Sequence, residues 1–288
     1  MKKSIAGCLT AALATLAFSS LAMAAPHHPK GEFAPFADCP LNRASLSDCV
    51  YQTVTAGSFT IGKKTVPLKN PITLQGGFEG GGTEISFFGA EDGNTLSKTP
   101  QPVPGGLLGI NPPASWPKSA KEKFNDFIDN GFTGVTATVE LAAPATSIRL
   151  NVENLIDEQG VAVQMPVKVK LDNRLLGNNC YIGSNSSPMV LSMTTGTTAP
   201  PAPNLPISGS FGPVSFNPAF TFITLGARLV DNAFSVPKAS GCGGLLSPFI
   251  DPLVNSLVGS PSPAGRNTAI LEGTMLDASA SAVRESEK

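Results

Sequence analysis

The sequence predicts a mainly β protein with an antiparallel sandwich or barrel-like core and one or two short helices. Several central segments alternate apolar and polar residues, most regularly at residues 167–171 (VKVKL), as strands with one buried face do. The chain contains 29 glycines and 26 prolines, which favour frequent turns. Charged residues make up only 14% of it, so Ser, Thr and Asn must supply much of the polar surface.

Residues 1–24 have the features of a secretory signal peptide. Lys2 and Lys3 precede an apolar stretch from Leu9 to Leu21, and residues 22–24 (AMA) match the pattern of a cleavage site. This stretch is too short to span a bilayer, and no later one is long and apolar enough. We therefore expect a secreted, extracellular protein of a bacterium, without a transmembrane segment.

The cysteine count points to disulfide bonds. Removal of the signal peptide leaves four cysteines, and an even number in an oxidising compartment favours two disulfides. Four cysteines allow three pairings, of which we favour Cys39–Cys49 and Cys180–Cys242.

The rest of the chain divides into a leader, a body and a tail. Residues 25–35 have no periodic apolar face and predict a flexible leader. Residues 36–276 predict a single β-rich domain, or alternatively two subdomains divided near residues 100–117, where Gly and Pro are frequent. Residues 277–288 predict a frayed tail.

Within the body, apolar alternation and turn residues predict a series of strands. The Gly62-Lys63 pair suits a tight turn between two of them, and the glycine-rich residues 76–82 predict a flexible turn. The predicted strands are residues 49–55, 57–62, 64–68, 71–75, 135–141, 148–152, 161–171, 189–194, 207–216, 220–225, 227–234 and 268–276.

Two segments have helical spacing. Ser119 can cap a helix whose Phe124, Phe127 and Ile128 share one face, and we expect this face to pack against a sheet. Residues 245–258 also carry apolar residues at helical intervals. Residues 151–158 can form either a strand end or a helical turn.

The distribution of histidine excludes several chemistries. Both histidines, His27 and His28, lie in the predicted leader, so Ser-His-Asp and Cys-His hydrolases lack their base. A zinc site would also need a CxxC spacing that the chain lacks. Ser115 and Lys118 match an S-x-x-K motif, but the companion motifs of that enzyme class are absent.

Paired carboxylates remain as a route to hydrolysis. The pairs are Glu79 with Glu84, Glu91 with Asp92, Asp157 with Glu158, and Glu140 with Glu153. With one Trp and two Tyr, the chain is poor in residues that line sugar clefts, so we predict no enzymatic activity, no cofactor and no metal. The formal net charge of −1 also gives no basic patch for nucleic acid.

The sixteen phenylalanines suggest a hydrophobic pocket between sheet and helix. Its candidate residues are Phe211, Phe216, Phe220, Phe222, Phe249 and Leu253. Core packing is the alternative interpretation of the same residues.

Four segments carry a resemblance to other proteins. They are residues 34–78 (beginning APFADCPLNR), 95–109 (TLSKTPQPVPGGLLG), 180–198 (CYIGSNSSPMVLSMTTGTT) and 240–259 (SGCGGLLSPFIDPLVNSLVG). In this order they resemble a group of exported, uncharacterised actinobacterial proteins. The resemblance implies export and paired cysteines; it implies no activity and no functional residues.

Together these features predict a non-enzymatic binding or structural protein of the extracellular space or cell envelope. The alternatives are a carrier of a small hydrophobic ligand, which predicts an enclosed apolar cavity, and a carboxylate-dependent hydrolase, which predicts converging acids. An envelope partner is also compatible with the sequence.

Overall fold

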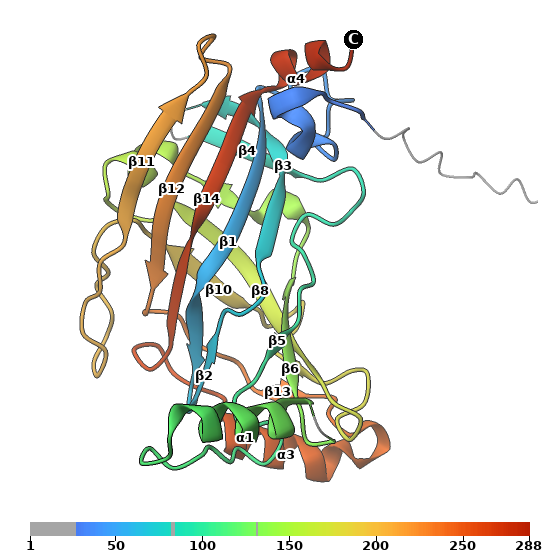
Figure 1. The fold of residues 1–288 in the computed structure, drawn as a ribbon, viewed down its shortest axis with the longest axis vertical. Helices are drawn as coiled ribbons and strands as arrows, with labels where there is room; N and C mark the ends of the chain where they lie inside the picture. The colour runs from blue at the N-terminus through green and yellow to red at the C-terminus, as the bar shows by residue number, and fades with distance from the viewer. Residues whose placement is uncertain (1–26, 82–83, 131) are drawn as a thin grey trace, which may run out of the picture.

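Two antiparallel sheets pack face to face in the computed structural model, which describes residues 27–81, 84–130 and 132–288 (Figure 1). The sandwich predicted from the strand pattern is confirmed, and over the described residues the sheets do not close into a barrel. The predicted signal peptide, residues 1–24, lies outside the described residues.

The first sheet has the strand order β11-β12-β14-β1-β3-β4, with β2 paired to the far end of β1. It combines strands from both ends of the chain, so residues 100–117 do not divide the protein into two separate sheets. Its strands are β1 (Asp48–Ile61), β2 (Lys64–Pro67), β3 (Ile72–Gly81), β4 (Glu84–Gly89), β11 (Ser210–Phe216), β12 (Phe222–Asp231) and β14 (Thr268–Ser279).

The second sheet is built around β8 and crosses behind the first (Figure 1). Thr194 and Val230 exchange backbone hydrogen bonds of 3.0 and 2.9 Å and so join the sheets at one corner. Its strands are β5 (Gln101–Pro102), β6 (Thr136–Leu141), β7 (Arg149–Leu150), β8 (Val163–Asp172), β9 (Tyr181–Ile182), β10 (Met189–Met193) and β13 (Ala239–Ser240).

Helices occupy the ends of the sandwich and one side of its interior. In Figure 1, α1 and α3 lie at the bottom and α4 at the top. The helical elements are η1 (Gly31–Phe36), α1 (Lys118–Asn130), η2 (Ala145–Ser147), α2 (Val152–Ile156), η3 (Gly244–Leu246), α3 (Ser247–Val258) and α4 (Ala280–Ser286).

Several strands are longer or shorter than predicted. The two strands predicted within residues 49–62 are the single strand β1 (48–61), with a register shift between Val54 and Ala56. The two predicted within residues 220–234 are the single strand β12 (222–231). The predicted strand at 148–152 shrinks to β7, because α2 begins at Val152. The two mergers follow from pairing, because one interrupting residue, Ala56 or Gly226, does not end a strand that has a partner on both sides.

The predicted turn at residues 76–82 is wrong for the described part, because β3 continues to Gly81. A Cβ atom at Gly76 would lie 2.2 Å from the carbonyl oxygen of Phe88 and 2.8 Å from the ring of Phe87. Glycine is therefore needed here for close approach of the strands.

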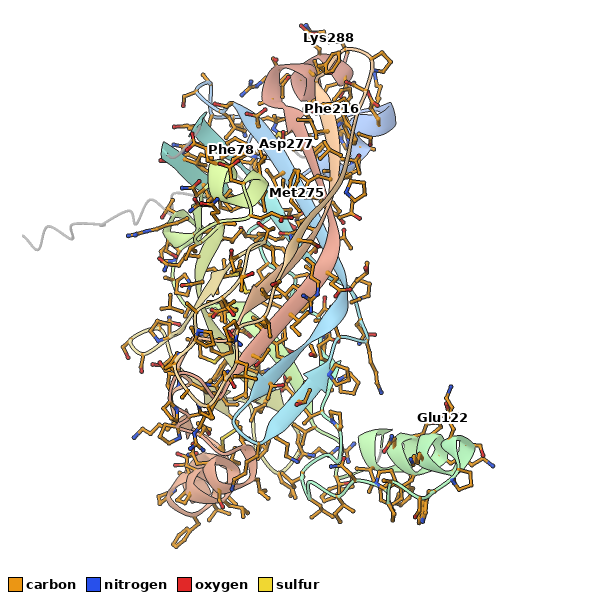
Figure 2. The ribbon with its side chains drawn as sticks, turned by 90° about the vertical axis from the view of Figure 1, so that its left-hand side faces the viewer. Phe78, Glu122, Phe216, Met275, Asp277 and Lys288 are labelled. Atoms are coloured by element: carbon orange, nitrogen blue, oxygen red, sulfur yellow. A yellow bond between two sulfur atoms is a disulfide. The ribbon has the colours of Figure 1, made fainter. Side chains whose placement is uncertain are left out.

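Helix α1 forms where the apolar spacing predicted it, but it begins at Lys118, so the predicted cap Ser119 lies inside its first turn. The helix also does not pack along a sheet. Figure 2 shows it projecting from the body. Ile128 is buried at its C-terminal end, whereas Phe127 is 76% exposed and Phe124 stacks edge-on against Trp116. The expectation of a sheet-packed helix is therefore wrong except at its last turn.

The predicted flexible leader is ordered where the structure describes it. Phe33 and Phe36 of η1 each stack edge-on against Phe222, with ring centroids 5.9 Å apart. His27 contacts the opposite end of the chain, since its Nδ1 lies 3.0 Å from Oε1 of Glu287.

The predicted frayed tail is also ordered. Residues 277–279 complete β14, and Ala280 and Val283 of α4 are fully buried. The guanidinium of Arg284 donates to the carbonyl oxygens of Leu41 and Arg43, at 3.1 and 2.7 Å. The two chain ends thus cover one end of the sandwich together.

Both favoured disulfides are present. Cys39–Cys49 joins the N-terminal segment to β1, and Cys180–Cys242 joins the residue before β9 to the segment before α3, with Cα–Cα distances of 5.7 and 4.1 Å. Two disulfides favour an oxidising, extracellular compartment. Within the described residues, no helix has the length and apolar character needed to cross a membrane.

Candidate functional site

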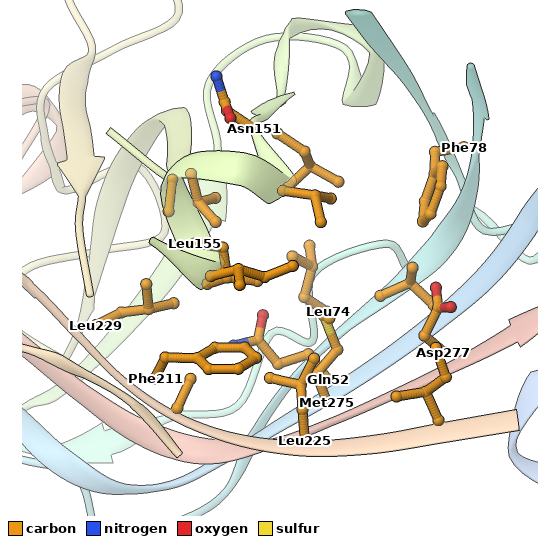
Figure 3. Close-up of a pocket in the computed structure, with 18 of the residues that line it drawn as sticks. Gln52, Leu74, Phe78, Asn151, Leu155, Phe211, Leu225, Leu229, Met275 and Asp277 are labelled. Atoms are coloured by element: carbon orange, nitrogen blue, oxygen red, sulfur yellow. The ribbon is translucent and has the colours of Figure 1, made fainter. Parts of the chain in front are cut away.

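A cavity of about 370 Å³ lies between the two sheets (Figure 3). This volume falls within the range of small-molecule sites in proteins, roughly 300–1,000 Å³. Its wall combines the inner face of the first sheet with α2 and the segments flanking it. Among the lining residues only Gln52, Asn151 and Asp277 are polar.

Strand alternation builds the sheet side of the wall. Every second residue of β12 from Ile223 to Leu229 faces the cavity, and Gly226 and Arg228 between them do not line it. Phe211, at the edge of the sheet, and Met275 contribute from the two strands that flank β12. The period of two thus gives a continuous apolar surface.

Helix α2 forms the opposite wall. Asn151 caps it, since its Oδ1 accepts a 2.9 Å hydrogen bond from the backbone N–H of Asn154. The hydroxyl of Thr195 donates to the carbonyl oxygen of Leu155 at 2.8 Å. Leu155 therefore presents its side chain to the cavity from a helix fixed at both ends (Figure 3).

The cavity meets the surface between α2 and β11. Its lining residues Ile156 and Phe216 are 52% and 53% exposed. The carboxylate of Glu158, just after α2, accepts a 2.6 Å hydrogen bond from the backbone N–H of Phe211. This bond connects the two sides of the opening.

Among the described residues of the wall, Asp277 is the one ionisable side chain. Its pKa is raised to about 7, first because burial penalises the charged form and second because Asp48 lies near it with the same charge. Its carboxyl makes no hydrogen bond or ion pair with the described residues. Figure 3 shows this carboxyl facing the cavity on the same side as Phe78.

A second, smaller cavity of about 50 Å³ lies further along the same interface. It shares four lining residues with the first: Gln52, Leu74, Val163 and Leu229. The unfilled space is thus elongated, with Asp277 away from the shared end.

The structure brings together only part of the predicted hydrophobic pocket. Phe211 and Phe216 line the cavity. Phe222 instead packs against the N-terminal segment, and Phe220, 74% exposed, lies beside Phe216 with ring centroids 5.5 Å apart.

Phe249 and Leu253 lie elsewhere, on α3 at the other end of the sandwich (Figure 1). They are 76% and 53% exposed, and they form an apolar surface with Leu245 and Leu246. The sequence analysis did not predict most of the aliphatic residues in the cavity wall, although the alternation from Ile223 to Leu229 indicated some of them.

The predicted carboxylate pairs do not line the cavity in the described residues. Glu79 accepts hydrogen bonds from Arg43 and Ser45, which lower its pKa. Glu140 lies 3.8 Å from the ammonium of Lys168. These acids are held by surface partners rather than aimed at a common point.

Among the described residues, no cluster of three or more His, Cys, Asp or Glu side chains could hold a metal ion. The S-x-x-K residues Ser115 and Lys118 lie at the start of α1, where the Lys118 ammonium is 3.8 Å from Glu122.

Comparisons of the chain with protein-family models, with curated proteins and with solved structures found no match.

Proposed function

We propose that this protein is a secreted, non-enzymatic binding protein of the extracellular space or cell envelope that carries a small hydrophobic ligand. The observation that supports this proposal is the elongated apolar cavity between the sheets. An interior normally packs as densely as an organic crystal. An apolar space of about 370 Å³ therefore leaves many wall atoms without contacts that a ligand could supply.

The chemistry of the wall supports a carrier rather than an enzyme. Of the twenty-one lining residues, eighteen are apolar, and burial of an apolar ligand there gains roughly 25 cal/mol per Å². The opening between α2 and β11 gives such a ligand a route of entry.

Binding of Nile red, a neutral probe that fluoresces in apolar surroundings, tests this proposal. We expect saturable binding with one site per chain. Ala227→Phe places a ring in the cavity and should weaken binding about tenfold or more, while the free energy of unfolding stays equal or rises because empty space is filled.

The matched control is Ala56→Phe, which adds the same ring at an exposed position of β1. It should leave the affinity unchanged. Equal affinities for Ala227→Phe and Ala56→Phe would refute a ligand site in this cavity. Native mass spectrometry of protein purified from its own culture medium gives a second readout: a mass excess lost on denaturation identifies a natural ligand.

A further inference from the structure

The carboxyl group of Asp277 in the cavity wall restricts the ligands that the cavity can bind. Asp277 is paired to Val50 on β1 and to Ile223 on β12, both apolar residues that also line the cavity. Its own sheet therefore offers its carboxyl no partner. Asp277 is half-buried, and its carboxyl has no hydrogen-bond partner among the described residues. A ligand that supplies a donor there would gain a charge-assisted hydrogen bond.

The position of Asp277 defines one end of the site. Ile223, opposite Asp277, and Leu229 are six residues apart on β12, which corresponds to about 20 Å along a strand. The lining between these residues on β12 is apolar. The site therefore suits a molecule with a long apolar part and one polar group at its end.

The charges around Asp277 select the kind of polar group. Asp48, on β1, carries the same charge and lies close enough to raise its pKa. Phe78 of β3 and Ile223 of β12 line the same end of the cavity (Figure 3), and its described lining contains no Lys, Arg or His. An anionic head group would thus meet an acidic end with no counter-ion. A cationic one would meet a carboxylate and an aromatic ring, both of which attract it.

We infer that the cavity takes amphiphiles with a basic amine head group, which pairs with the carboxylate of Asp277 while the apolar tail lies between the sheets. This inference rests on the proposed function and narrows its ligand class. On binding, a protonated Asp277 must release its proton, so that one ammonium and one carboxylate form the pair. Affinity for an amine should therefore fall as the pH is lowered from 8 to 5.5.

Three probes of equal chain length distinguish the contribution of the head group to affinity from that of the tail. They are dodecylamine, dodecanol and dodecanoic acid, each used to displace Nile red. At pH 8 we expect the amine to bind about tenfold more tightly than the alcohol, since a hydrogen bond between two charged groups is worth about that much. The acid should bind more weakly than the alcohol, because its carboxylate meets that of Asp277.

Asp277→Asn should bring the affinities for amine and alcohol to within about threefold of each other while alcohol binding persists. Asp48→Asn is the matched control: it removes a neighbouring carboxylate that does not line the cavity, and should keep the preference for the amine. Circular dichroism of both variants verifies folding.

The outcomes separate the two proposals. Equal binding of amine and alcohol by the unmodified protein, or a preference retained in Asp277→Asn, overturns the assignment of the head group and leaves the carrier function standing. If no probe binds and Nile red is not taken up, both proposals fail.

Discussion

Asp277 stands directly opposite Val50 in the β1–β14 ladder, and both residues line the cavity between the sheets. An acidic side chain is thus held in an apolar row, where no described residue pairs with it. The arrangement costs folding energy, because the charged form of the carboxyl loses its hydration there. Strongly shifted pKa values cluster at binding and catalytic sites.

This cost predicts a dependence of stability on pH. The pKa of Asp277 rises from 3.8 to about 7 on folding, so the folded protein keeps a proton that the unfolded chain has lost between these values. The contribution of Asp277 to stability is complete below pH 3.8 and declines as the pH rises to about 7. Urea unfolding should show the free energy of the unmodified protein falling over this range relative to Asp277→Asn.

The exposed Asp126 of α1 provides the control. Asp126→Asn should follow the unmodified protein at every pH. A constant difference between the unmodified protein and Asp277→Asn from pH 4 to pH 8 would contradict the shifted pKa.

The disulfides should contribute unequally to stability. Cys180–Cys242 closes a loop of 62 residues and Cys39–Cys49 a loop of 10. The loop-entropy relation then gives about 4 kcal/mol for the first and about 3 kcal/mol for the second. Urea unfolding of the two double Cys→Ala variants measures both. All four cysteines are buried, so a larger loss in the short-loop variant would argue against loop closure as the main effect.

Glu158 should control the rate at which ligands enter and leave. Its carboxylate bonds the backbone N–H of Phe211 across the opening of the cavity, so Glu158→Ala should accelerate Nile red exchange several-fold while changing the affinity little. Stopped-flow fluorescence measures both rates. Asp157→Ala, at the exposed neighbouring position, serves as control; exchange equally fast in both variants would show that this bond does not restrict access.

The C-terminal helix should be part of the folded unit. Val283 is fully buried against the N-terminal segment, and Val283→Ala should lower the free energy of unfolding by about 2 kcal/mol. Glu285→Ala, on the exposed side of the same helix, should change it by less than about 0.5 kcal/mol. Similar values for the two variants would mean that the tail does not stabilise the protein.

The apolar surface formed by α3 with Leu245 and Leu246 should play no part in ligand uptake. Phe249→Ser alters a side chain that is 76% exposed and remote from the cavity lining. It should leave Nile red affinity unchanged, whereas Phe211→Ser should weaken it several-fold by removing a wall ring. Loss of binding in Phe249→Ser would instead show that Phe249 belongs to the binding site, as predicted from the sequence.

The sequence by itself determined the features that depend on local pattern. Period-two alternation predicted most strands of both sheets. The even cysteine count predicted two disulfides, and of their three possible pairings the favoured one is present. The helical spacing of Phe124, Phe127 and Ile128 predicted helix α1, although not its start, because Ser119 lies within the helix. In each case the signal lies within a few neighbouring residues, or in the count of the one residue type that forms disulfide bonds.

Only the tertiary structure decided which apolar residues share a wall. Phe211 and Phe249 look equivalent in sequence, yet one faces the cavity and the other faces outward from α3. The same applies to the tail, where Val283 is buried because an N-terminal segment more than 200 positions away covers it. An apolar pattern in the sequence indicates which face of an element is buried. Which residues cover that face, and whether a cavity remains beneath it, depends on how elements distant in the sequence pack together.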